Sequence, residues 1–293
     1  MKRAAQEPKR LVREISRLYY RRGRKWEFNE SGIDIFEKDW DTLALLDACR
    51  YDTFSDVNEL PGELRSVESR AASTYEFLVA NVSERRLWDT VYVTANPMLH
   101  RHREQLLPDF HAVENVWANE GWDEEYRTVR PKTVTEAAIR AHRRHPNKRL
   151  LVHYIQPHYP YIGPIGREHF PLQNLSLKNE LAETDVSKET LKRAYRENLE
   201  LALPAVRDLQ KSVDGRTVIS SDHGELLGER TGPVPLTEYG HPSGIYISAL
   251  TQVPWHVCPT SERREIVETK PEQDAEKIES ETVNDRLTAL GYK

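Results

Sequence analysis

The sequence predicts an α/β fold, a three-layer α/β/α sandwich with a mainly parallel central sheet. The run 43–47 is apolar until its final acid and does not alternate with polar residues, as is typical of a strand buried on both faces of a parallel sheet. Helical patterns lie between this run and several later strand candidates. The 293 residues are 38% hydrophobic and 30% charged, which provides a full core and a charged surface.

The strand candidates and one long helix follow in order along the chain. Strands are expected at 43–47, 90–94, 111–117, 149–155 and 217–221. The clearest helix spans 188–211, where apolar residues recur every three or four positions after Ser187, a suitable N-cap. The segment 163–185 is rich in Pro, Gly, Asn and Ser, so we expect an insertion over the mouth of a site.

Three regions are expected along the chain. Residues 1–30 form a basic N-terminal arm or helix, 31–258 a catalytic domain, and 259–293 a charged C-terminal extension with a peripheral helix. Residues 1–26 hold ten Lys or Arg against two Glu, a local net charge of +8. The apolar residues of the arm recur at helical spacing: Leu11, Ile15, Leu18 and Tyr19. The arm is therefore either an amphipathic helix on an anionic membrane or a solvated helix that docks on its own domain.

Composition excludes several other classes of protein. The formal net charge of -5 gives no general basic field, so no nucleic-acid partner is expected. No stretch approaches the roughly 18 apolar residues of a membrane span, and no secretory signal is evident. The two cysteines, Cys49 and Cys258, are too few for a disulfide framework. We expect a cytoplasmic protein, with the arm as the one candidate for peripheral membrane contact.

The strongest local signal is the strand 217–221 followed by Asp222, His223 and Gly224. Ligands of open α/β sheets collect beyond the carboxyl ends of strands, and a carboxylate beside an imidazole suits a divalent cation. The alternative is that Asp222 caps a helix and His223 lies on the surface. Asp47 ends the first strand at the same predicted edge, where it too is either a ligand or a helix cap.

Two further segments favour a site. A loop rich in Pro and Gly contains His241 after Gly240, and the strand 149–155 leads into His153-Tyr-Ile-Gln156-Pro-His158-Tyr-Pro-Tyr161. The second segment is also compatible with an aromatic turn that packs on the core. Two histidines in it are more than packing requires.

Taken in order, these elements resemble the alkaline phosphatase superfamily, and most closely its sulfatase-like and phosphoglycerol-transferase-like members. The resemblance covers roughly residues 40–257 and rests most on Ser221-Asp222-His223-Gly224-Glu225. It implies a metal-dependent enzyme that cleaves or transfers a phosphate or sulfate ester of a glycan, lipid head group or small metabolite. It also implies metal ligands, which are Asp47, Thr74, Asp222, His223 and His241.

The resemblance places a hydroxyl nucleophile between the first strand and the next helix. Thr74 fits that position best, at the start of an expected helix whose dipole favours an anion, and Ser73 is the rival. Either hydroxyl is equally compatible with an N-cap. True sulfatases oxidise a Cys in a Cys-x-Pro-Ser-Arg context, which neither Cys49 nor Cys258 matches. Phosphate ester chemistry is therefore favoured over sulfate ester chemistry.

The remaining residues are expected to contact the substrate or a second ion. His158 is expected to protonate the leaving group, to bind the ester oxygen or to complete a second metal site with His241. The expected substrate-binding residues are Arg50, Ser73, His153 and Gln156. His and carboxylate ligands favour Zn or Mn, in one or two ions. A phosphodiesterase or phosphomonoesterase of nucleotides and an inactive binding protein with this fold remain as alternatives.

Overall fold

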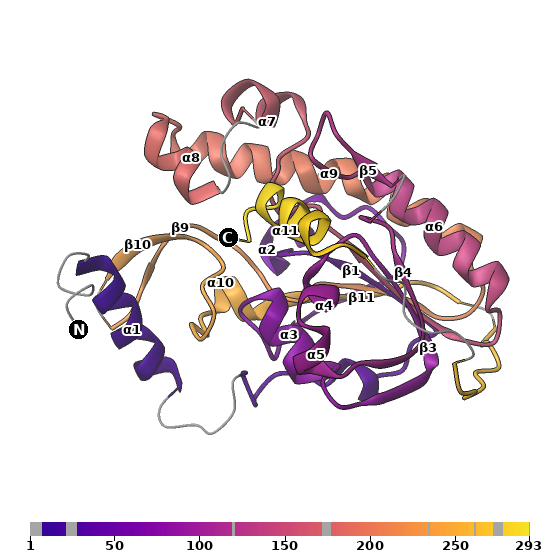
Figure 1. The fold of residues 1–293 in the computed structure, drawn as a ribbon. Helices are drawn as coiled ribbons and strands as arrows, with labels where there is room; N and C mark the ends of the chain where they lie inside the picture. The colour runs from indigo at the N-terminus through magenta and orange to yellow at the C-terminus, as the bar shows by residue number, and fades with distance from the viewer. Residues whose placement is uncertain are drawn as a thin grey trace.

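The computed structural model describes residues 8–21, 28–118, 121–171, 177–233, 235–260, 262–271 and 278–292. Across these residues the central layer is a seven-stranded sheet of order β2-β11-β8-β1-β7-β3-β4 (Figure 1). The strands that run parallel are β1 (Thr42–Leu46), β3 (Arg86–Thr94), β4 (Asp109–Asn115), β7 (Arg149–Tyr154) and β8 (Thr217–Ser220). The antiparallel strands β11 (Gln252–Val257) and β2 (Glu63–Glu68) complete one edge. The predicted fold class is confirmed.

Helices cover both faces of this sheet, as Figure 1 shows. The helices α6 (Pro131–Arg144) and α9 (Lys188–Ser212) pack against each other on one face. On the other face lie α3 (Thr74–Asn81), α4 (Met98–Arg101) and α5 (Arg103–Leu106). Strand β1 shows why two layers are needed: Ala44 and Leu46 pack in one hydrophobic cluster, while Leu43 and Leu45 pack in another. Successive side chains of a strand point to opposite faces, so an all-apolar strand requires cover on both.

The other elements complete the described part of the chain. They are α1 (Pro8–Arg21), η2 (Ile35–Glu37), α2 (Tyr51–Val57), β5 (Trp122–Asp123), β6 (Thr128–Val129), α7 (Pro164–His169), α8 (Leu177–Glu183), β9 (Leu226–Thr231), β10 (Leu236–Gly240), α10 (Ser248–Thr251) and α11 (Ser280–Ala289). Strands β9 and β10 form a hairpin, and α1 lies beside it, away from the main sheet (Figure 1). The predicted insertion at 163–185 contains α7 and α8, and its residues 172–176 lie outside the described part.

The C-terminal region is an integral part of the domain. Val283, Leu287 and Leu290 are buried in the same hydrophobic cluster as α6 and α9, so the predicted helix is present but is not peripheral. The segment before this helix is also held to the domain, at Val267. The Lys148 ammonium donates to the Val267 carbonyl oxygen at 2.7 Å and to the Trp88 carbonyl oxygen at 2.8 Å. Among the described residues, no helix has both the length and the apolar character that crossing a membrane requires.

Candidate active site

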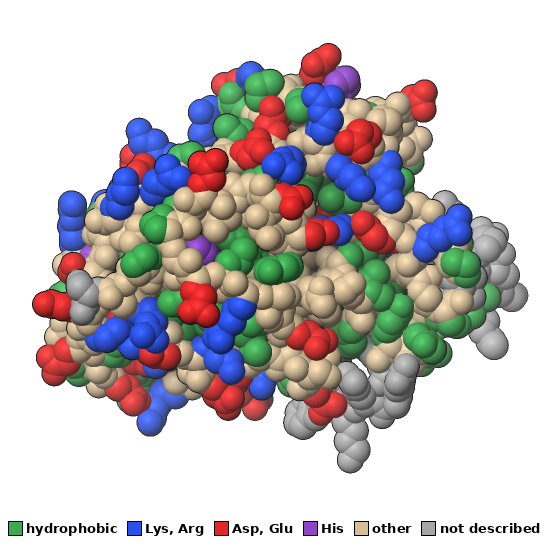
Figure 2. Space-filling model, turned by 180° about the vertical axis from the view of Figure 1, so that it is seen from behind, with side chains coloured by type: hydrophobic (Ala, Val, Ile, Leu, Met, Phe, Trp, Pro, Cys, Tyr) green, Lys and Arg blue, Asp and Glu red, His purple; other side chains and the backbone are tan. Residues whose placement is uncertain are grey.

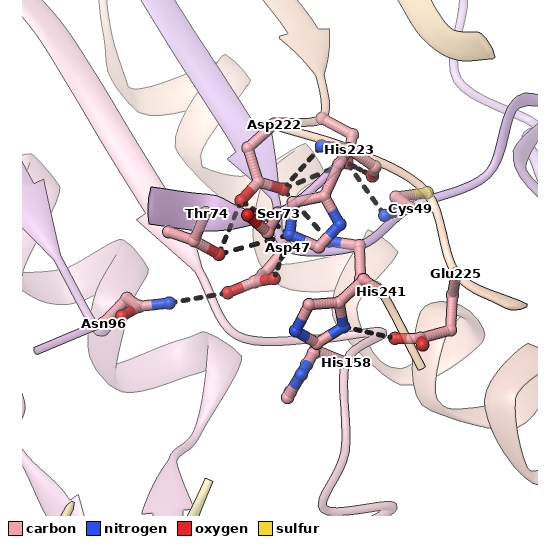
Figure 3. Close-up of polar contacts among 12 residues, drawn as sticks. Asp47, Cys49, Ser73, Thr74, Asn96, His158, Asp222, His223, Glu225 and His241 are labelled. Atoms are coloured by element: carbon pink, nitrogen blue, oxygen red, sulfur yellow. Dashed lines mark hydrogen bonds and ion pairs between the residues drawn. The ribbon is translucent and has the colours of Figure 1, made fainter. Parts of the chain in front are cut away.

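The site lies where two neighbouring parallel strands end. Strand β1 pairs with β8 so that Leu45 is opposite Ser220, and this register places Asp47 beside Asp222 and His223. One potential ligand atom from each of these three residues lies within 4.8 Å of the others. We call these three residues the first ligand group (Figure 3). The convergence predicted from the strand ends is therefore present.

The backbone that follows β1 holds the group in place. Ala48 has a φ of 60°, which turns its N–H toward Asp222 Oδ1 at 3.1 Å. The N–H of Cys49 donates to Ser221 Oγ at 2.8 Å. A non-glycine residue with positive φ is uncommon and requires support from its surroundings. Asp222 therefore fixes the loop after β1 as well as facing the site.

Thr74 brings a hydroxyl to the first ligand group. It is the first residue of α3, and its Oγ1 donates to Asp222 Oδ2 at 2.9 Å and lies 3.2 Å from His223 Nε2. Ser73 instead is the N-cap of α3, and its Oγ contacts Ser243 Oγ at 2.8 Å. The geometry thus places the Thr74 hydroxyl at the carboxylates and the Ser73 hydroxyl at the helix cap.

The electrostatics of the first ligand group fit a bound cation. Asp47 and Asp222 are fully buried, and within the described part of the chain their only ion-pair partners are His153 and His223. Burial raises the pKa of Asp47 well above its ordinary value, and the neighbouring Asp222 raises it further. Asp47 Oδ1 has no hydrogen-bond partner among these residues. Two buried carboxyl groups that face histidines but, among the described residues, no Lys or Arg, and that keep an unpaired oxygen, form a site that a divalent cation would stabilise.

The two histidines around these carboxylates are neutral near pH 7. Burial lowers the pKa of His223 to about 4, and burial also lowers the pKa of His153. His153 Nε2 lies 3.6 Å from Asp222 Oδ2, while its Nδ1 lies 2.8 Å from the Tyr92 hydroxyl. A neutral imidazole nitrogen can ligate a metal ion. His153 is wholly buried beside the two carboxylates, where it can orient them, and its contact with substrate remains a prediction.

A second ligand group lies next to the first and consists of His158, Glu225 and His241. The sequence left His241 either with the first cation or in a second site with His158, and the structure groups it with His158 and Glu225. Its Nδ1 lies 3.2 Å from Glu225 Oε2, and its ring centre lies 4.7 Å from that of His223. All three members line a cavity of about 190 Å³, together with Leu177 and Lys178 of the predicted insertion.

The pKa values of the two imidazoles of this second group are shifted in opposite directions. Burial and the neighbouring His241 lower the pKa of His158 well below its ordinary value. Burial also acts to lower the pKa of His241, but the Glu225 carboxylate overcomes it and raises that pKa. The cavity wall therefore presents one neutral imidazole and one paired with a carboxylate.

Two residues predicted to bind substrate are held by the protein itself. The Arg50 guanidinium pairs with Asp52 and, at 2.7 Å, with Glu229. Gln156 is buried and donates its Nε2 to the Val129 carbonyl oxygen at 3.3 Å. Substrate binding by either side chain remains a prediction, and Arg50 would first have to leave its carboxylate partners.

Three residues of the site received no role in the sequence analysis. Glu225 was part of the predicted motif but was given no function. Asn96 follows the end of β3, where a strand was expected, and donates to Asp47 Oδ2 at 2.7 Å. Tyr292 comes from the end of the chain, and its hydroxyl donates to the same oxygen at 2.6 Å. Its ring stacks on His158 with centres 5.0 Å apart, a contact that no local pattern predicts.

Comparison with solved structures gives matches of the predicted kind. The chain is similar to the C-terminal periplasmic domain of phosphoethanolamine transferase EptC from Campylobacter jejuni (TM-score 0.49, 16% identity, 74% of this chain and 77% of that one). It is similar to lipooligosaccharide phosphoethanolamine transferase A from Neisseria meningitidis (0.49, 14%, 73% and 47%). It is also similar to an alkaline phosphatase superfamily protein from Vibrio parahaemolyticus (0.46, 13%, 85% and 65%). At such identities these likenesses concern the fold alone. No family model matches the chain, and neither does any curated protein.

Proposed function

We propose that this chain is a metal-dependent enzyme that cleaves or transfers a phosphate ester through a covalent intermediate on Thr74. The observation that carries the proposal is the position of Thr74 Oγ1, 2.9 Å from Asp222 Oδ2 and 3.2 Å from His223 Nε2. A hydroxyl held at the start of a helix, beside a group that suits a cation, has the arrangement of an activated nucleophile.

The first ligand group and Thr74 would hold a divalent ion, for which Zn or Mn fits the mixture of carboxylate and imidazole. When bound, such an ion lowers the pKa of a hydroxyl and neutralises charge on a phosphoryl group. The second ligand group offers a further set of donors beside the first, so the choice between one and two ions stays open. We favour one firmly held ion, in the first group.

The chain's own residues then order the reaction. Asp222 accepts the hydrogen bond from Thr74 and holds Oγ1 at the first ligand group. A bond forms between Thr74 Oγ1 and phosphorus as the ester P–O bond breaks, and the alcohol leaves with a proton. Water or an acceptor alcohol then breaks the Thr74–phosphate bond. His158 and His241 line the cavity and are the candidates to donate and accept the protons of these steps.

Phosphate is favoured over sulfate because the position nearest the carboxylates is occupied by a threonine. Cys49 is buried, and its thiol faces the Arg50 carbonyl oxygen at 3.8 Å. Cys258 is buried in the core cluster just beyond β11. The substrate class proposed is a phosphate ester of a glycan, a lipid head group or a small metabolite. Hydrolysis of nucleotide esters and an inactive binding protein are the competing proposals.

A panel of aryl phosphate monoesters, phosphate diesters and sulfates tests this function. With Mn or Zn added, the proposal expects cleavage of phosphate esters, little cleavage of sulfates, and loss of activity in chelator or in Asp222→Asn. Activity that survives both would contradict the metal-dependent mechanism. Metal binding without turnover of any ester would favour the binding protein.

A further inference from the structure

Helix α1 is attached to the domain through its polar side. Arg13 pairs with Glu238 of the β9–β10 hairpin, and Arg17 Nε donates to the Ser243 carbonyl oxygen at 3.0 Å. Arg17 lies one helical turn after Arg13, and Tyr20 lies two turns after it. The Tyr20 hydroxyl accepts a hydrogen bond from the Gly232 N–H at 3.3 Å. The attachment therefore combines hydrogen bonds, one ion pair and the packing of the Tyr20 ring on a small hydrophobic cluster.

The opposite side of α1 is apolar and open to solvent. The exposed fractions are 52% for Leu11, 41% for Ile15, 73% for Leu18 and 45% for Tyr19. Their spacing places them on one side of the helix, which we call the α1 stripe. A surface helix normally turns such a stripe toward the core. In Figure 2, where the α1 side is on the right, hydrophobic side chains gather at the lower right of the surface.

The residues of the α1 stripe lie in a segment of the sequence that is rich in Lys and Arg. Besides Arg13 and Arg17, the first 26 residues contain eight more basic residues: Lys2, Arg3, Lys9, Arg10, Arg21, Arg22, Arg24 and Lys25. An anionic bilayer attracts each such residue near its surface by about 1 kcal/mol. An apolar stripe within a basic segment is the composition of a helix that lies in a membrane interface.

The same helix borders the candidate active site. Arg13 lines the cavity of about 190 Å³ that also holds His158, Glu225 and His241. Arg17 binds the carbonyl of Ser243, whose hydroxyl contacts Ser73, the residue before Thr74. The α1 stripe and the cavity therefore lie on opposite sides of one helix, about 10 Å apart.

We infer that α1 docks the enzyme on an anionic bilayer, with the stripe at the boundary between headgroups and acyl chains. The substrate is then a phosphate ester in the headgroup of a membrane lipid or lipid-linked glycan, and the site meets it in the plane of the membrane. This substrate class rests on the proposed function. The docking itself rests only on the helix.

The test compares three forms of the full-length protein. The stripe variant combines Leu11→Ser, Ile15→Ser and Leu18→Ser. The control variant combines Leu107→Ser and Leu201→Ser. These are the other large hydrophobic residues that are exposed in the described part of the chain, at 59% and 43%, and they lie away from α1. Each form is floated with vesicles of phosphatidylcholine, with and without phosphatidylglycerol. Sedimentation velocity and turnover of a soluble aryl phosphate are measured in parallel.

Wild type and control are expected to float only with vesicles that contain phosphatidylglycerol. The stripe variant should bind these vesicles about tenfold or more weakly, because three apolar side chains that would enter the membrane interface are replaced by serine. It should also lose release of the lipid headgroup while aryl phosphate turnover stays unchanged. Equal flotation of all three forms, or a wild-type dimer that dissociates only in the stripe variant, would overturn the membrane assignment. Flotation without turnover of any ester would retain docking and reject the proposed function.

Discussion

The hydroxyl of Tyr292 donates a 2.6 Å hydrogen bond to Asp47 Oδ2, so the penultimate residue of the chain closes on the first strand end. The same hydroxyl accepts from Asn96 Nδ2 at 2.8 Å and lies 3.3 Å from Thr74 Oγ1. The C-terminal region is thus tied to the candidate site by a single phenol. Several consequences of this arrangement can be measured.

Tyr292→Phe keeps the ring stacked on His158 and removes the donor to Asp47. We expect a loss of about 1–2 kcal/mol in the free energy of unfolding of the metal-free protein, because a buried carboxyl loses a partner. Urea unfolding measures it. Tyr126→Phe, at an exposed contact with Arg167, is the control and should change stability by less than about 0.5 kcal/mol. Equal stability of Tyr292→Phe and wild type would mean that the hydrogen bond stabilises nothing.

Thr74 and Ser73 can be separated kinetically. Thr74→Val removes the proposed nucleophile and should reduce kcat by about a thousandfold or more, whereas Thr74→Ser should retain much of the activity. Ser73→Ala removes the N-cap of α3 and should cost about 1 kcal/mol of stability but leave the chemistry intact. Steady-state turnover of an aryl phosphate together with urea unfolding distinguishes the two roles. If Ser73→Ala were inactive and Thr74→Val active, the assignment would be reversed.

The two ligand groups predict different effects on metal binding. Asp222→Asn removes a ligand of the first group and should weaken binding of the tight Zn or Mn ion by about 100-fold or more. His241→Gln alters only the second group and should leave that ion bound, with activity reduced. Isothermal titration calorimetry of each variant measures this. Equal losses of affinity would indicate one shared ion, as the sequence motifs suggested.

The lowered pKa of Asp34 predicts how the free energy of unfolding changes at acid pH. Burial acts to raise the pKa of Asp34, but hydrogen bonds and charge from Arg85, with Arg70 and the Phe36 N–H, lower it below the ordinary value. Its stabilising effect is therefore complete above the unfolded pKa of about 3.9 and is lost as pH falls through the lower folded pKa. Asp34→Asn should cost about 1–3 kcal/mol at neutral pH and flatten the decline in stability below pH 4. Unfolding curves from pH 2.5 to 7 check both; an unchanged acid limb would exclude this origin.

The sequence was sufficient for the parts of the fold whose signal is local. The five parallel strands and the helix after Ser187 were all predicted. Burial on both faces leaves a direct pattern in β1, β7 and β8, and regular spacing of apolar residues does so in the helix. Strand β2 was missed because it is an edge strand with largely exposed side chains, so backbone pairing with β11 defines it. Pro254 obscured β11, since proline is unfavourable within a sheet.

The site shows the same division. Asp47, Asp222 and His223 could be predicted because each directly follows a strand of one parallel sheet, whose carboxyl ends share an edge. The grouping of His241 with Glu225 depends on how the β9–β10 hairpin folds back, which no local spacing specifies. Tyr292 reaches Asp47 across 245 positions of the chain, and only the packed position of α11 explains the contact.

The most direct test of the account is to trap the covalent intermediate. The metal-loaded protein is mixed with an aryl phosphate, quenched in acid, and digested for peptide mass mapping. The account predicts a phosphoryl group on Thr74 that is absent from Thr74→Val and from protein treated with chelator. A phosphoryl group on Ser73, or rapid turnover with no modified residue at any time after mixing, would contradict it.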